Sequence, residues 1–333
     1  MKVAVIGCGS ISKMHLEALR DNPDTQIIAV ADIKPDRADK AAEEYGAKAY
    51  YDFDELLKNE HPDSVHICTP HYLHTDYAVK ALLSGINVLT EKPCSVSFEE
   101  IEKLRSAQKE SGKQLGVCFQ NRYNNCVCLA KKIIAEKSLG ELLSIRAFVT
   151  WSRGEDYYGD DWHGTADKEC GGVLINQAIH TVDLIQYFAG KCRKVTAHIS
   201  NDHLKGIIEV EDNASVIMEL EGGKTAMLYA TTAYSENSDV LIELSFEKGK
   251  LRLEGDRIYS ISGSDITEIG ERPEAIYHGQ SYWGVGHSIL INDYYDCLKN
   301  NRNFEIDAFE GSDAEKIVFA AYKSSKTGES VNI

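Results

Sequence analysis

A glycine-rich turn lies close to the start of the chain. The residues Gly7–Ser12 directly follow the apolar run Val3–Ile6 and open a stretch of helical pattern. In that setting Gly7 allows a tight turn and Gly9 lets the backbone approach a pyrophosphate, while the first amides of the helix point at negative charge. The third position of the motif is Ser12 instead of glycine, and a side chain this small still permits helix and strand to pack closely. The turn predicts a dinucleotide site with contacts from Gly7, Gly9, Ser10 and Ile11.

The acidic residue Asp32 ends the second apolar run, Ile27–Ala31. A carboxylate at this place accepts hydrogen bonds from the adenosine ribose hydroxyls and repels a 2′-phosphate, which favours NAD over NADP. Two cations, Lys34 and Arg37, follow closely and keep NADP open as the alternative. The structural alternative is that Asp32 caps the helix that begins at Pro35. We expect NAD to be the cofactor.

Lys92 stands in the tripeptide Glu91-Lys92-Pro93, directly after the apolar run Asn87–Thr90. Loops at the carboxyl ends of parallel strands are where doubly wound folds bind their ligands. A lysine in a loop is usually a solvated charge, but Pro93 restricts the backbone of this one. The position predicts that Lys92 points into the cofactor cleft.

Polar residues recur within the apolar segment Gly172–Phe188. If this segment is one helix, they fall on a single face, and a polar stripe through an apolar helix needs partners or a cavity. The stripe consists of Asn176, His180, Asp183 and Tyr187. His180 is the candidate for chemistry, the alternative being a core histidine whose hydrogen bonds are satisfied internally.

Lys92 and His180 together suit the oxidation of a secondary alcohol. When a hydride goes to a nicotinamide, the hydroxyl proton has to be removed, and an imidazole, which titrates near neutral pH, can accept it. A neighbouring ammonium group can hydrogen-bond the substrate oxygen and stabilise the developing alkoxide. We predict that these two residues form the catalytic pair.

The elements that must position these residues fall into two patterns. In the first part of the chain, short β-branched runs with few charges alternate with helical segments, as expected of a parallel sheet buried on both faces. The expected strands are Val3–Ile6, Ile27–Ala31, Ser64–Cys68, Asn87–Thr90 and Leu115–Phe119. The expected helices are His15–Asp21, Pro35–Tyr45, Phe53–Asn59, Thr75–Ser84 and Ser97–Ser111. We predict an α/β NAD-binding Rossmann domain over residues 1–121, with a doubly wound parallel sheet.

After residue 122 the pattern changes to long segments of period two, which follow an expected helix over Cys126–Lys137. They predict a large, mainly antiparallel open sheet in an α+β domain, residues 122–333. The strands are Leu142–Trp151, Val195–Ser200, Ala214–Glu221, Thr225–Tyr234, Val240–Glu247, Lys250–Glu254 and Arg257–Ser262, and on the first of them Leu143, Ile145, Ala147, Val149 and Trp151 share one face. The helices expected to cover this sheet are Gly172–Phe188, Gly286–Asn300 and Ser312–Lys326.

The other face of the expected sheet still carries apolar residues, namely Phe148, Ile217, Met227 and Tyr229. An open, half-apolar sheet face with nothing to cover it favours subunit packing over plain exposure to solvent. We expect a homo-oligomer, a dimer or a tetramer, formed through this domain.

Composition excludes several classes of protein. The net charge of −16 over 333 residues, without any cluster of Lys and Arg, argues against a nucleic-acid partner. No apolar run is long enough for a membrane helix, and the first one ends at Gly7, too early for a signal peptide. The nine cysteines show neither zinc-site spacing nor a disulfide framework. We expect a cytoplasmic protein with reduced thiols and without a metal.

Taken together, these motifs resemble the Gfo/Idh/MocA oxidoreductase family, which includes glucose–fructose oxidoreductase and inositol dehydrogenase. The resemblance covers essentially the whole chain, and its combination of motifs is specific although each motif alone is not. It rests on Gly7–Ser12, Thr69-Pro70 with His74, Glu91-Lys92-Pro93, Gly171–Asp183 and the tail from Tyr322 to Val331.

The resemblance implies that Lys92 and His180 are catalytic. It implies further cofactor contacts from Thr69, Pro70, His71, His74 and Glu91, and Lys92 is counted with them. We assign the substrate to Lys92, Asn121, Arg122, Tyr158, Trp162, Asn176 and His180.

Asn176 departs from the inositol-dehydrogenase pattern, in which an aspartate stands four residues before the histidine. An amide cannot charge the imidazole as a carboxylate can, although it can bind a sugar hydroxyl. The stretch from Tyr157 to Gly164 resembles members that oxidise C3 of glucosides or other glycosyl compounds. We therefore expect a sugar or glycoside dehydrogenase, with inositol dehydrogenase as an alternative.

Two further readings stay open. A sugar-nucleotide 3-dehydrogenase would need basic residues for the diphosphate, and the second domain shows no clear cluster of them. A non-enzymatic, dinucleotide-sensing regulator could also use this fold. Such a protein could lose Lys92 or His180 freely, whereas both are present here.

Overall fold

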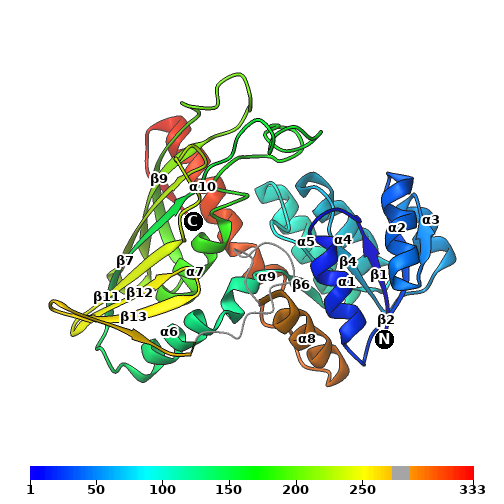
Figure 1. The fold of residues 1–333 in the computed structure, drawn as a ribbon, viewed down its shortest axis with the longest axis horizontal. Helices are drawn as coiled ribbons and strands as arrows, with labels where there is room; N and C mark the ends of the chain where they lie inside the picture. Colours follow the sequence, from blue (N-terminus) through cyan, green and yellow to red (C-terminus); the bar gives the residue numbers. More distant parts are fainter. Residues whose placement is uncertain (272–285) are drawn as a thin grey trace. The chain divides into compact units, whose positions relative to one another are not determined.

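The computed structural model describes residues 1–271 and 286–333, which form two compact units (Figure 1). The first unit contains Met1–Gln120 and a later segment that runs to Ser312. The second unit contains the chain from Asn121 onward and the tail Asp313–Ile333. Both units are therefore discontinuous along the sequence.

The first unit is built on a six-stranded parallel sheet with the order β3-β2-β1-β4-β5-β6. The strands are β1 (Lys2–Ile6), β2 (Gln26–Ala31), β3 (Lys48–Tyr50), β4 (Ser64–Ile67), β5 (Asn87–Thr90) and β6 (Leu115–Val117). This is the predicted doubly wound sheet, with β3 as an additional edge strand. The strand order reverses between β1 and β4, which is the place where such sheets bind their ligands.

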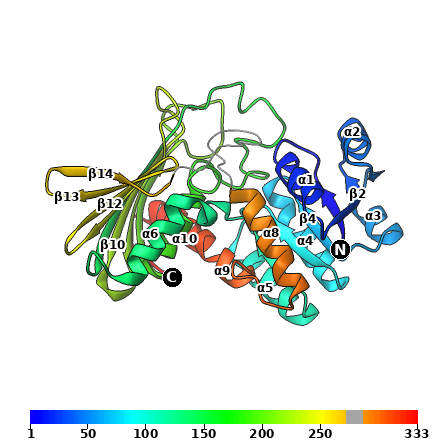
Figure 2. The ribbon, with the colours of Figure 1, turned by 60° about the horizontal axis from the view of Figure 1, so that its bottom comes forward.

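Seven α-helices are described in the first unit. They are α1 (Ser12–Asp21), α2 (Pro35–Tyr45), α3 (Phe53–Asn59), α4 (His74–Leu83), α5 (Phe98–Ser111), α8 (Gly286–Lys299) and α9 (Ala308–Gly311). Local sequence sets the limits of α5: the Ser97 hydroxyl accepts a hydrogen bond from the Glu100 amide, and Gly112 ends the helix in the left-handed region. The helix α8 packs against α1, as Figures 1 and 2 show. The expectation that this helix covers the second sheet is therefore wrong.

The second unit contains a nine-stranded sheet with the order β14-β13-β12-β11-β7-β10-β9-β8-β15. All neighbouring strands are antiparallel except the central pair β7 and β10, which is parallel. The strands are β7 (Leu142–Thr150), β8 (Cys192–Ser200), β9 (Asn213–Leu220), β10 (Thr225–Thr231), β11 (Leu241–Phe246), β12 (Gly249–Glu254), β13 (Arg257–Ser262), β14 (Asp265–Ile269) and β15 (Val331–Asn332). The predicted large, mainly antiparallel sheet is confirmed, with β14 and β15 added at its two edges.

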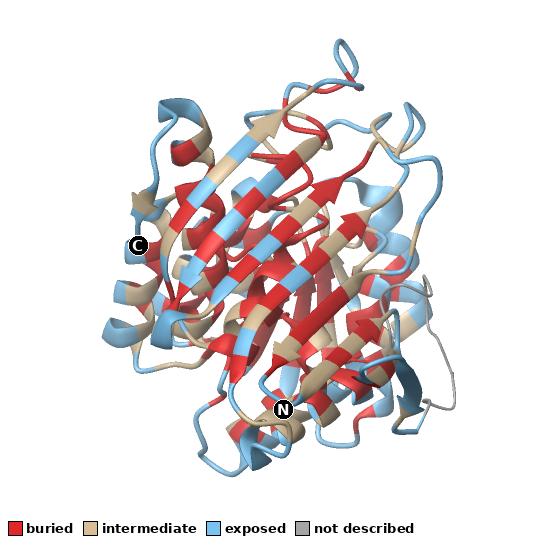
Figure 3. Cartoon of the chain, turned by 90° about the vertical axis from the view of Figure 1, so that its left-hand side faces the viewer, coloured by how far each residue is buried: buried red, intermediate tan, exposed pale blue. Residues whose placement is uncertain are grey.

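Helices cover one face of this sheet. They are α6 (Asn125–Glu136), α7 (Ile179–Ala189) and α10 (Asp313–Thr327). Figure 3 looks onto the other face, where exposed and buried residues alternate along the strands. On that face Ile217 and Met227 are exposed. Leu143 of β7 is exposed too, so its predicted place beside the buried Ile145, Ala147 and Val149 is wrong. The pairing of β11 with β7 shifts register at this end, so Phe246 lies opposite the buried Leu142.

No disulfide joins any of the nine cysteines. Among the described residues no helix has the length and apolar character that crossing a membrane requires.

Candidate active site

The glycine-rich turn follows β1 and has the geometry that its motif requires. Gly7 has a φ of +89°, and a Cβ atom there would lie 2.5 Å from the carbonyl oxygen of Cys68. A Cβ atom on Gly9, by contrast, would meet no protein atom within 4 Å, so the space above this residue is open to a ligand. Ser12 is buried at the start of α1, and its hydroxyl donates to the Gly9 carbonyl oxygen at 2.6 Å.

The sheet order brings the other predicted cofactor contacts to the same edge. Asp32 follows β2 and the glycine-rich turn follows β1, while Thr69 and Glu91 follow β4 and β5. Because these four strands are parallel neighbours, all four loops lie at the carboxyl edge, with the glycine-rich turn between Asp32 and the other two. The open space at Gly9 and this row of loops fit an extended dinucleotide.

The Asp32 side chain lies against the glycine-rich turn. Its carboxylate accepts hydrogen bonds from the backbone amides of Cys8 and Lys34, both at 2.8 Å. The nearby Cys8 thiol has its pKa raised to about 12 by burial and by the Asp32 charge, so it stays protonated and inert. Within the turn, Ser10 is exposed and Ile11 is half-buried.

Replacing Asp32 by serine should change the choice of cofactor. The neutral side chain loses the ribose hydrogen bonds, each worth about 1.5–3 kcal/mol when the acceptor is charged, and no longer repels a 2′-phosphate. We expect NAD⁺ to bind at least about tenfold more weakly and NADP⁺ more tightly, measured by isothermal titration calorimetry. Unchanged affinities for both cofactors in Asp32→Ser would contradict the assignment.

The loop after β4 carries Thr69 and Pro70, which are half-buried, and the buried His71. His74, at the start of α4, is buried and lies between two loops of the carboxyl edge. Its two ring nitrogens lie 2.6 Å from the carbonyl oxygens of Pro93 and Thr69. His74 therefore links the loop after β4 to the loop after β5 through backbone contacts.

Glu91 and Lys92 follow β5, and the Lys92–Pro93 peptide bond is cis. The Glu91 carboxylate is buried and accepts hydrogen bonds from the His15 ring at 2.9 Å and from the Lys92 amide at 3.3 Å. Burial acts to raise the pKa of the Glu91 carboxyl, but hydrogen bonds from His15 and His287 outweigh it and hold that pKa well below its usual range. Lys92 itself is half-buried.

Sequence reasoning missed the buried polar cluster around Glu91. His15 from α1, His66 from β4, Cys118 after β6 and His287 from α8 gather there. The ligand-type atoms of His15, Glu91 and Cys118 lie within 4.8 Å of one another. A histidine in the middle of a buried strand, as His66 is, needs a hydrogen-bond partner, and that was the available signal.

In the second unit, the segment around His180 differs from its prediction. The helix α7 begins at Ile179 instead of Gly172, and the preceding residues form turns. The buried Glu211 holds this segment in turns: its carboxylate accepts hydrogen bonds from the amides of Gly172 and Leu174, and its carbonyl oxygen accepts the Val173 amide. The Ala178 amide then donates to the Val173 carbonyl oxygen, five residues back, so this stretch lacks the regular series of i→i−4 bonds of a helix.

Asn176 lies in these turns, and His180 lies in the first turn of α7. From Gly171 to Ile185 every residue is buried except these two, which are partly exposed. The Asn176 amide donates to the buried Glu169 at 2.5 Å and to the Tyr157 hydroxyl at 3.3 Å. Asn176 and His180 are therefore partly exposed residues within a segment that is otherwise packed in the interior of the unit.

The other two polar residues of the predicted stripe, Asp183 and Tyr187, both contact Arg122. Arg122 and Asp183 form a buried bidentate ion pair, with N–O distances of 2.8 and 2.5 Å. The Arg122 guanidinium also lies 4.7 Å from the centre of the Tyr187 ring. Asn121, directly before this arginine, is partly exposed.

Breaking this ion pair should destabilise the second unit. In Asp183→Ala the Arg122 charge is left buried without its carboxylate, which costs about 3–5 kcal/mol. We expect that loss in the free energy of unfolding measured with urea. Arg193→Ala, which removes an exposed pair with Glu221, is the matched control and should cost about 0.5 kcal/mol or less. Equal effects in the two variants would contradict the buried pair's role.

The loop between β7 and the turns carries the predicted aromatic contacts, Tyr158 and Trp162, both half-buried. The Tyr158 ring packs against Leu204, Ile208 and Val210, and its hydroxyl donates to Thr232 at 3.4 Å. The centres of the Trp162 and His163 rings lie 3.7 Å apart, and His163 Nδ1 lies 2.7 Å from the Asp160 carboxylate. This loop offers aromatic faces and hydroxyl groups in the same unit as His180.

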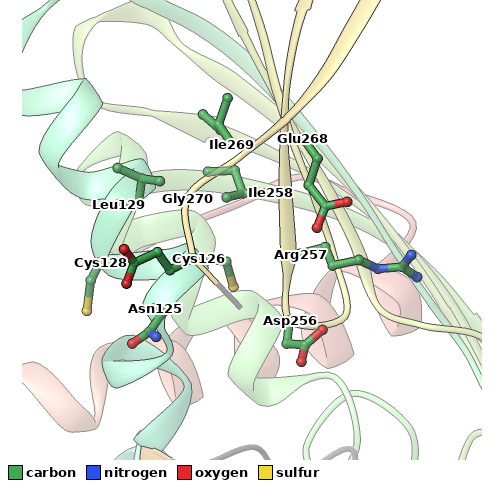
Figure 4. A pocket seen from close by; sticks show the side chains of 11 residues that line it. Asn125, Cys126, Cys128, Leu129, Asp256, Arg257, Ile258, Glu268, Ile269 and Gly270 are labelled. Atoms are coloured by element: carbon green, nitrogen blue, oxygen red, sulfur yellow. The ribbon is translucent and has the colours of Figure 1, made fainter. Parts of the chain in front are cut away.

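A hollow elsewhere in the second unit lies between α6 and the hairpin of β13 and β14, and Figure 4 shows it. Its lining includes Cys126, Asp256 and Glu268. None of the predicted substrate-binding residues is among the described residues that line it.

Lys92 and His180, the predicted catalytic pair, belong to different units. Within its own unit, Lys92 lies at the edge that carries the cofactor loops. Within the other, His180 lies in the first turn of α7, four residues after Asn176, which bonds Tyr157 of the aromatic loop.

Comparison with known families gives matches over most of the chain. Residues 1–119 match the family model described as an oxidoreductase family with an NAD-binding Rossmann fold, and residues 127–252 match the GFO/IDH/MocA C-terminal domain. D-glucoside 3-dehydrogenase of Escherichia coli (strain K12) is 25% identical, in an alignment that covers 100% of this chain and 97% of that protein. Inositol 2-dehydrogenase of Arthrobacter sp. (strain FB24) is 26% identical, with 100% and 96% covered.

Solved structures agree with this. The WlbA dehydrogenase from Bordetella pertussis, in complex with NADH and UDP-GlcNAcA, is 26% identical with a TM-score of 0.87, and the match covers 100% of this chain and 98% of that one. Levoglucosan dehydrogenase in complex with NADH and levoglucosan shares the fold, with a TM-score of 0.90 at 21% identity and coverage of 100% and 99%. The chain therefore belongs to the Gfo/Idh/MocA family of NAD-binding oxidoreductases.

Proposed function

We propose that this enzyme oxidises a secondary hydroxyl group of a sugar or glycoside, at C3, with Lys92 and His180 as its catalytic residues. The observation that carries the proposal is the exposure pattern around His180: Asn176 and His180 alone reach solvent within an otherwise buried segment. Surface polar groups on a packed base suit a ligand rich in hydroxyl groups. The similarity to D-glucoside 3-dehydrogenase supports the choice of substrate class.

Bound NAD⁺ supplies the acceptor for the hydride that leaves the carbinol carbon. His180 takes the hydroxyl proton on its imidazole, so that the C–H and O–H bonds of the alcohol are replaced by a carbonyl. The Lys92 ammonium donates a hydrogen bond to the substrate oxygen and stabilises its developing negative charge. In the reverse direction His180 returns the proton to the substrate oxygen while Lys92 donates its hydrogen bond to that oxygen.

The proposed substrate contacts are Asn121, Tyr158, Trp162 and Asn176, together with the catalytic pair. Arg122 supports them through its contacts with Asp183 and Tyr187. Inositol remains less suited because Asn176 stands where a carboxylate is expected in the inositol-dehydrogenase pattern.

Incubation with NAD⁺ and a panel of glucosides, inositols and UDP-sugars tests the proposal. We expect NADH absorbance, or a 3-keto product in product analysis, with the glucosides. Turnover of a UDP-sugar alone would favour a sugar-nucleotide 3-dehydrogenase, the class to which the complex with UDP-GlcNAcA points. Tight NAD⁺ binding with no product from any compound would favour a dinucleotide-sensing regulator.

We also propose a homo-oligomer formed through the open face of the nine-stranded sheet, in a cytoplasmic enzyme. Ile217 and Met227 are 55 and 43% exposed on that face, and burying them against a second copy removes them from water. Light scattering should find a dimer or larger assembly, and the double variant Ile217→Asp, Met227→Asp should shift it towards the monomer. An unchanged mass in the variant would refute this interface.

A further inference from the structure

A chain of hydrogen bonds runs through the interior of the first unit and ends at Glu91. The Tyr295 hydroxyl lies 2.8 Å from His66 Nε2, His66 Nδ1 lies 2.7 Å from His15 Nδ1, and His15 Nε2 lies 2.9 Å from Glu91 Oε1. All four side chains are buried. They come from α8, β4, α1 and the loop after β5, so the chain joins elements that are far apart in the sequence.

With a neutral His15, the charge on Glu91 sets the direction of each proton in this chain. An ionised carboxylate only accepts, so His15 Nε2 donates to it. The other nitrogen of a neutral His15 then accepts from His66 Nδ1, which leaves His66 Nε2 to accept from the Tyr295 hydroxyl. Burial holds the pKa of His66 well below its usual range, in agreement with a neutral ring. One arrangement of protons thus satisfies every group in the chain.

The Glu91 carboxylate also contacts the backbone of Lys92, in the loop after β5. While Oε1 of Glu91 accepts from His15, Oε2 accepts the backbone amide of Lys92 at 3.3 Å. A shift of the carboxylate therefore moves the backbone from which the Lys92 side chain extends. We propose that His15, held by His66 and Tyr295, is a positioning residue for Lys92, because it fixes the Glu91 carboxylate that binds the Lys92 amide. This inference rests on the proposed role of Lys92.

Other ionisable groups also face Glu91 and enter any titration of its carboxyl. They are Cys68 after β4, His74 of α4, Lys92 of the same loop, Cys118 after β6 and His287 of α8. Burial and the Glu91 charge raise the pKa values of both thiols well above their usual range, so they stay neutral. Burial lowers the pKa of His287, which lies 3.5 Å from the carboxylate.

Two variants of His15 separate its two hydrogen bonds. The amide nitrogen of glutamine reaches about as far as Nε2 of histidine, so His15→Gln keeps a donor to Glu91 and loses the link to His66. Asparagine is shorter, so His15→Asn keeps a group near His66 and loses the donor to Glu91. Since each variant gives up one buried hydrogen bond, each is the folding control for the other, with thermal melting as the check.

The first readout is the titration of the Glu91 carboxyl in the NAD complex, followed by carbon NMR of enzyme labelled at glutamate carboxyls and assigned with Glu91→Gln. Loss of the donor in His15→Asn should raise the midpoint by at least about one pH unit, whereas His15→Gln should stay close to wild type. Tyr295→Phe, which keeps the ring but removes the hydroxyl, should shift the midpoint in the same direction by less. Since this readout needs no substrate, it does not depend on the proposed reaction.

The second readout is turnover of the substrate found with the panel. In His15→Asn we expect kcat to fall about tenfold or more, the acid limb of its pH profile to move upward, and KM for the sugar to change little. His15→Gln should keep kcat within about threefold. An unchanged titration midpoint of the Glu91 carboxyl in His15→Asn and Tyr295→Phe would overturn the proposed role of His15. A stoichiometric metal ion in the purified protein would overturn it as well, because the ion would then hold the His15 and Glu91 side chains. A shifted carboxyl with unchanged kcat would overturn the link to Lys92 and leave the proposed reaction intact.

Discussion

Replacing Lys92 by methionine is expected to lower kcat for the sugar substrate by about 10²–10³-fold, the loss typical when one donor to a developing oxyanion is removed. Methionine keeps the length and most of the apolar stem of the side chain, so the loss isolates the ammonium group. Because Lys92 stabilises charge that develops only in the transition state, KM for the sugar should change far less than kcat. Steady-state kinetics on purified enzyme measures both.

The control for Lys92→Met is the affinity for NAD⁺, which the backbone around Gly9 and the Asp32 carboxylate should keep within a few-fold of wild type. Lys13→Met, which alters an exposed side chain of α1, should leave both affinity and turnover unchanged. A Lys92→Met enzyme that turns over at the normal rate would rule Lys92 out of the chemistry. A parallel loss of kcat in His180→Ala would support the pairing of the two residues.

Alanine at Gly7 and alanine at Gly9 should fail in different ways. At Gly7 the new Cβ meets the Cys68 carbonyl oxygen at 2.5 Å, in a backbone conformation with a φ of +89° that L side chains rarely adopt. We expect a loss of at least about 2 kcal/mol in the free energy of unfolding, and poor recovery of folded protein. At Gly9 the Cβ meets no protein atom, so the fold should be as stable as wild type.

The Gly9→Ala variant should instead bind NAD⁺ at least about tenfold more weakly, because the methyl group fills the space through which the pyrophosphate approaches the backbone. Thermal melting without the cofactor and calorimetric titration with it measure the two effects separately. Normal NAD⁺ binding by Gly9→Ala would mean that the dinucleotide does not cross this turn. A Gly7→Ala protein of full stability would contradict the close approach to Cys68.

The sequence predicted the parallel sheet of the first unit well because its signals are local. Each strand of the parallel sheet is a short apolar run, and each cofactor loop directly follows one, so the order along the chain determined which residues share an edge. The edge strand β3 was missed since three residues carry no period. The prediction of α5 was accurate because its cap, Ser97, and its terminator, Gly112, both lie at its own ends.

The errors arose where a distant residue decides the local structure. The start of α7 was misplaced because Glu211, far along the chain, binds the amides of Gly172 and Leu174. The segment does have a helical pattern of apolar and polar residues, but that local pattern cannot show that a carboxylate from a distant part of the chain binds its amides. The surroundings of Glu91 were hidden for the same reason: His15 and His287 reach it from opposite ends of the chain. In both cases the missing information is tertiary.

The helix α8 has a consequence for how the protein is made. Its buried residues Leu290, Ile291, Tyr294 and Tyr295 belong to the core of the first unit, yet they are synthesised after nearly all of the second. The unit that begins to leave the ribosome first thus stays incomplete until most of the second has been made, and until then the surface of α1 that α8 covers is open to water or to chaperones. For the same reason a fragment cut after residue 121 would lack part of its own core. A separately expressed cofactor domain should include α8, joined back to the amino-terminal part by a linker.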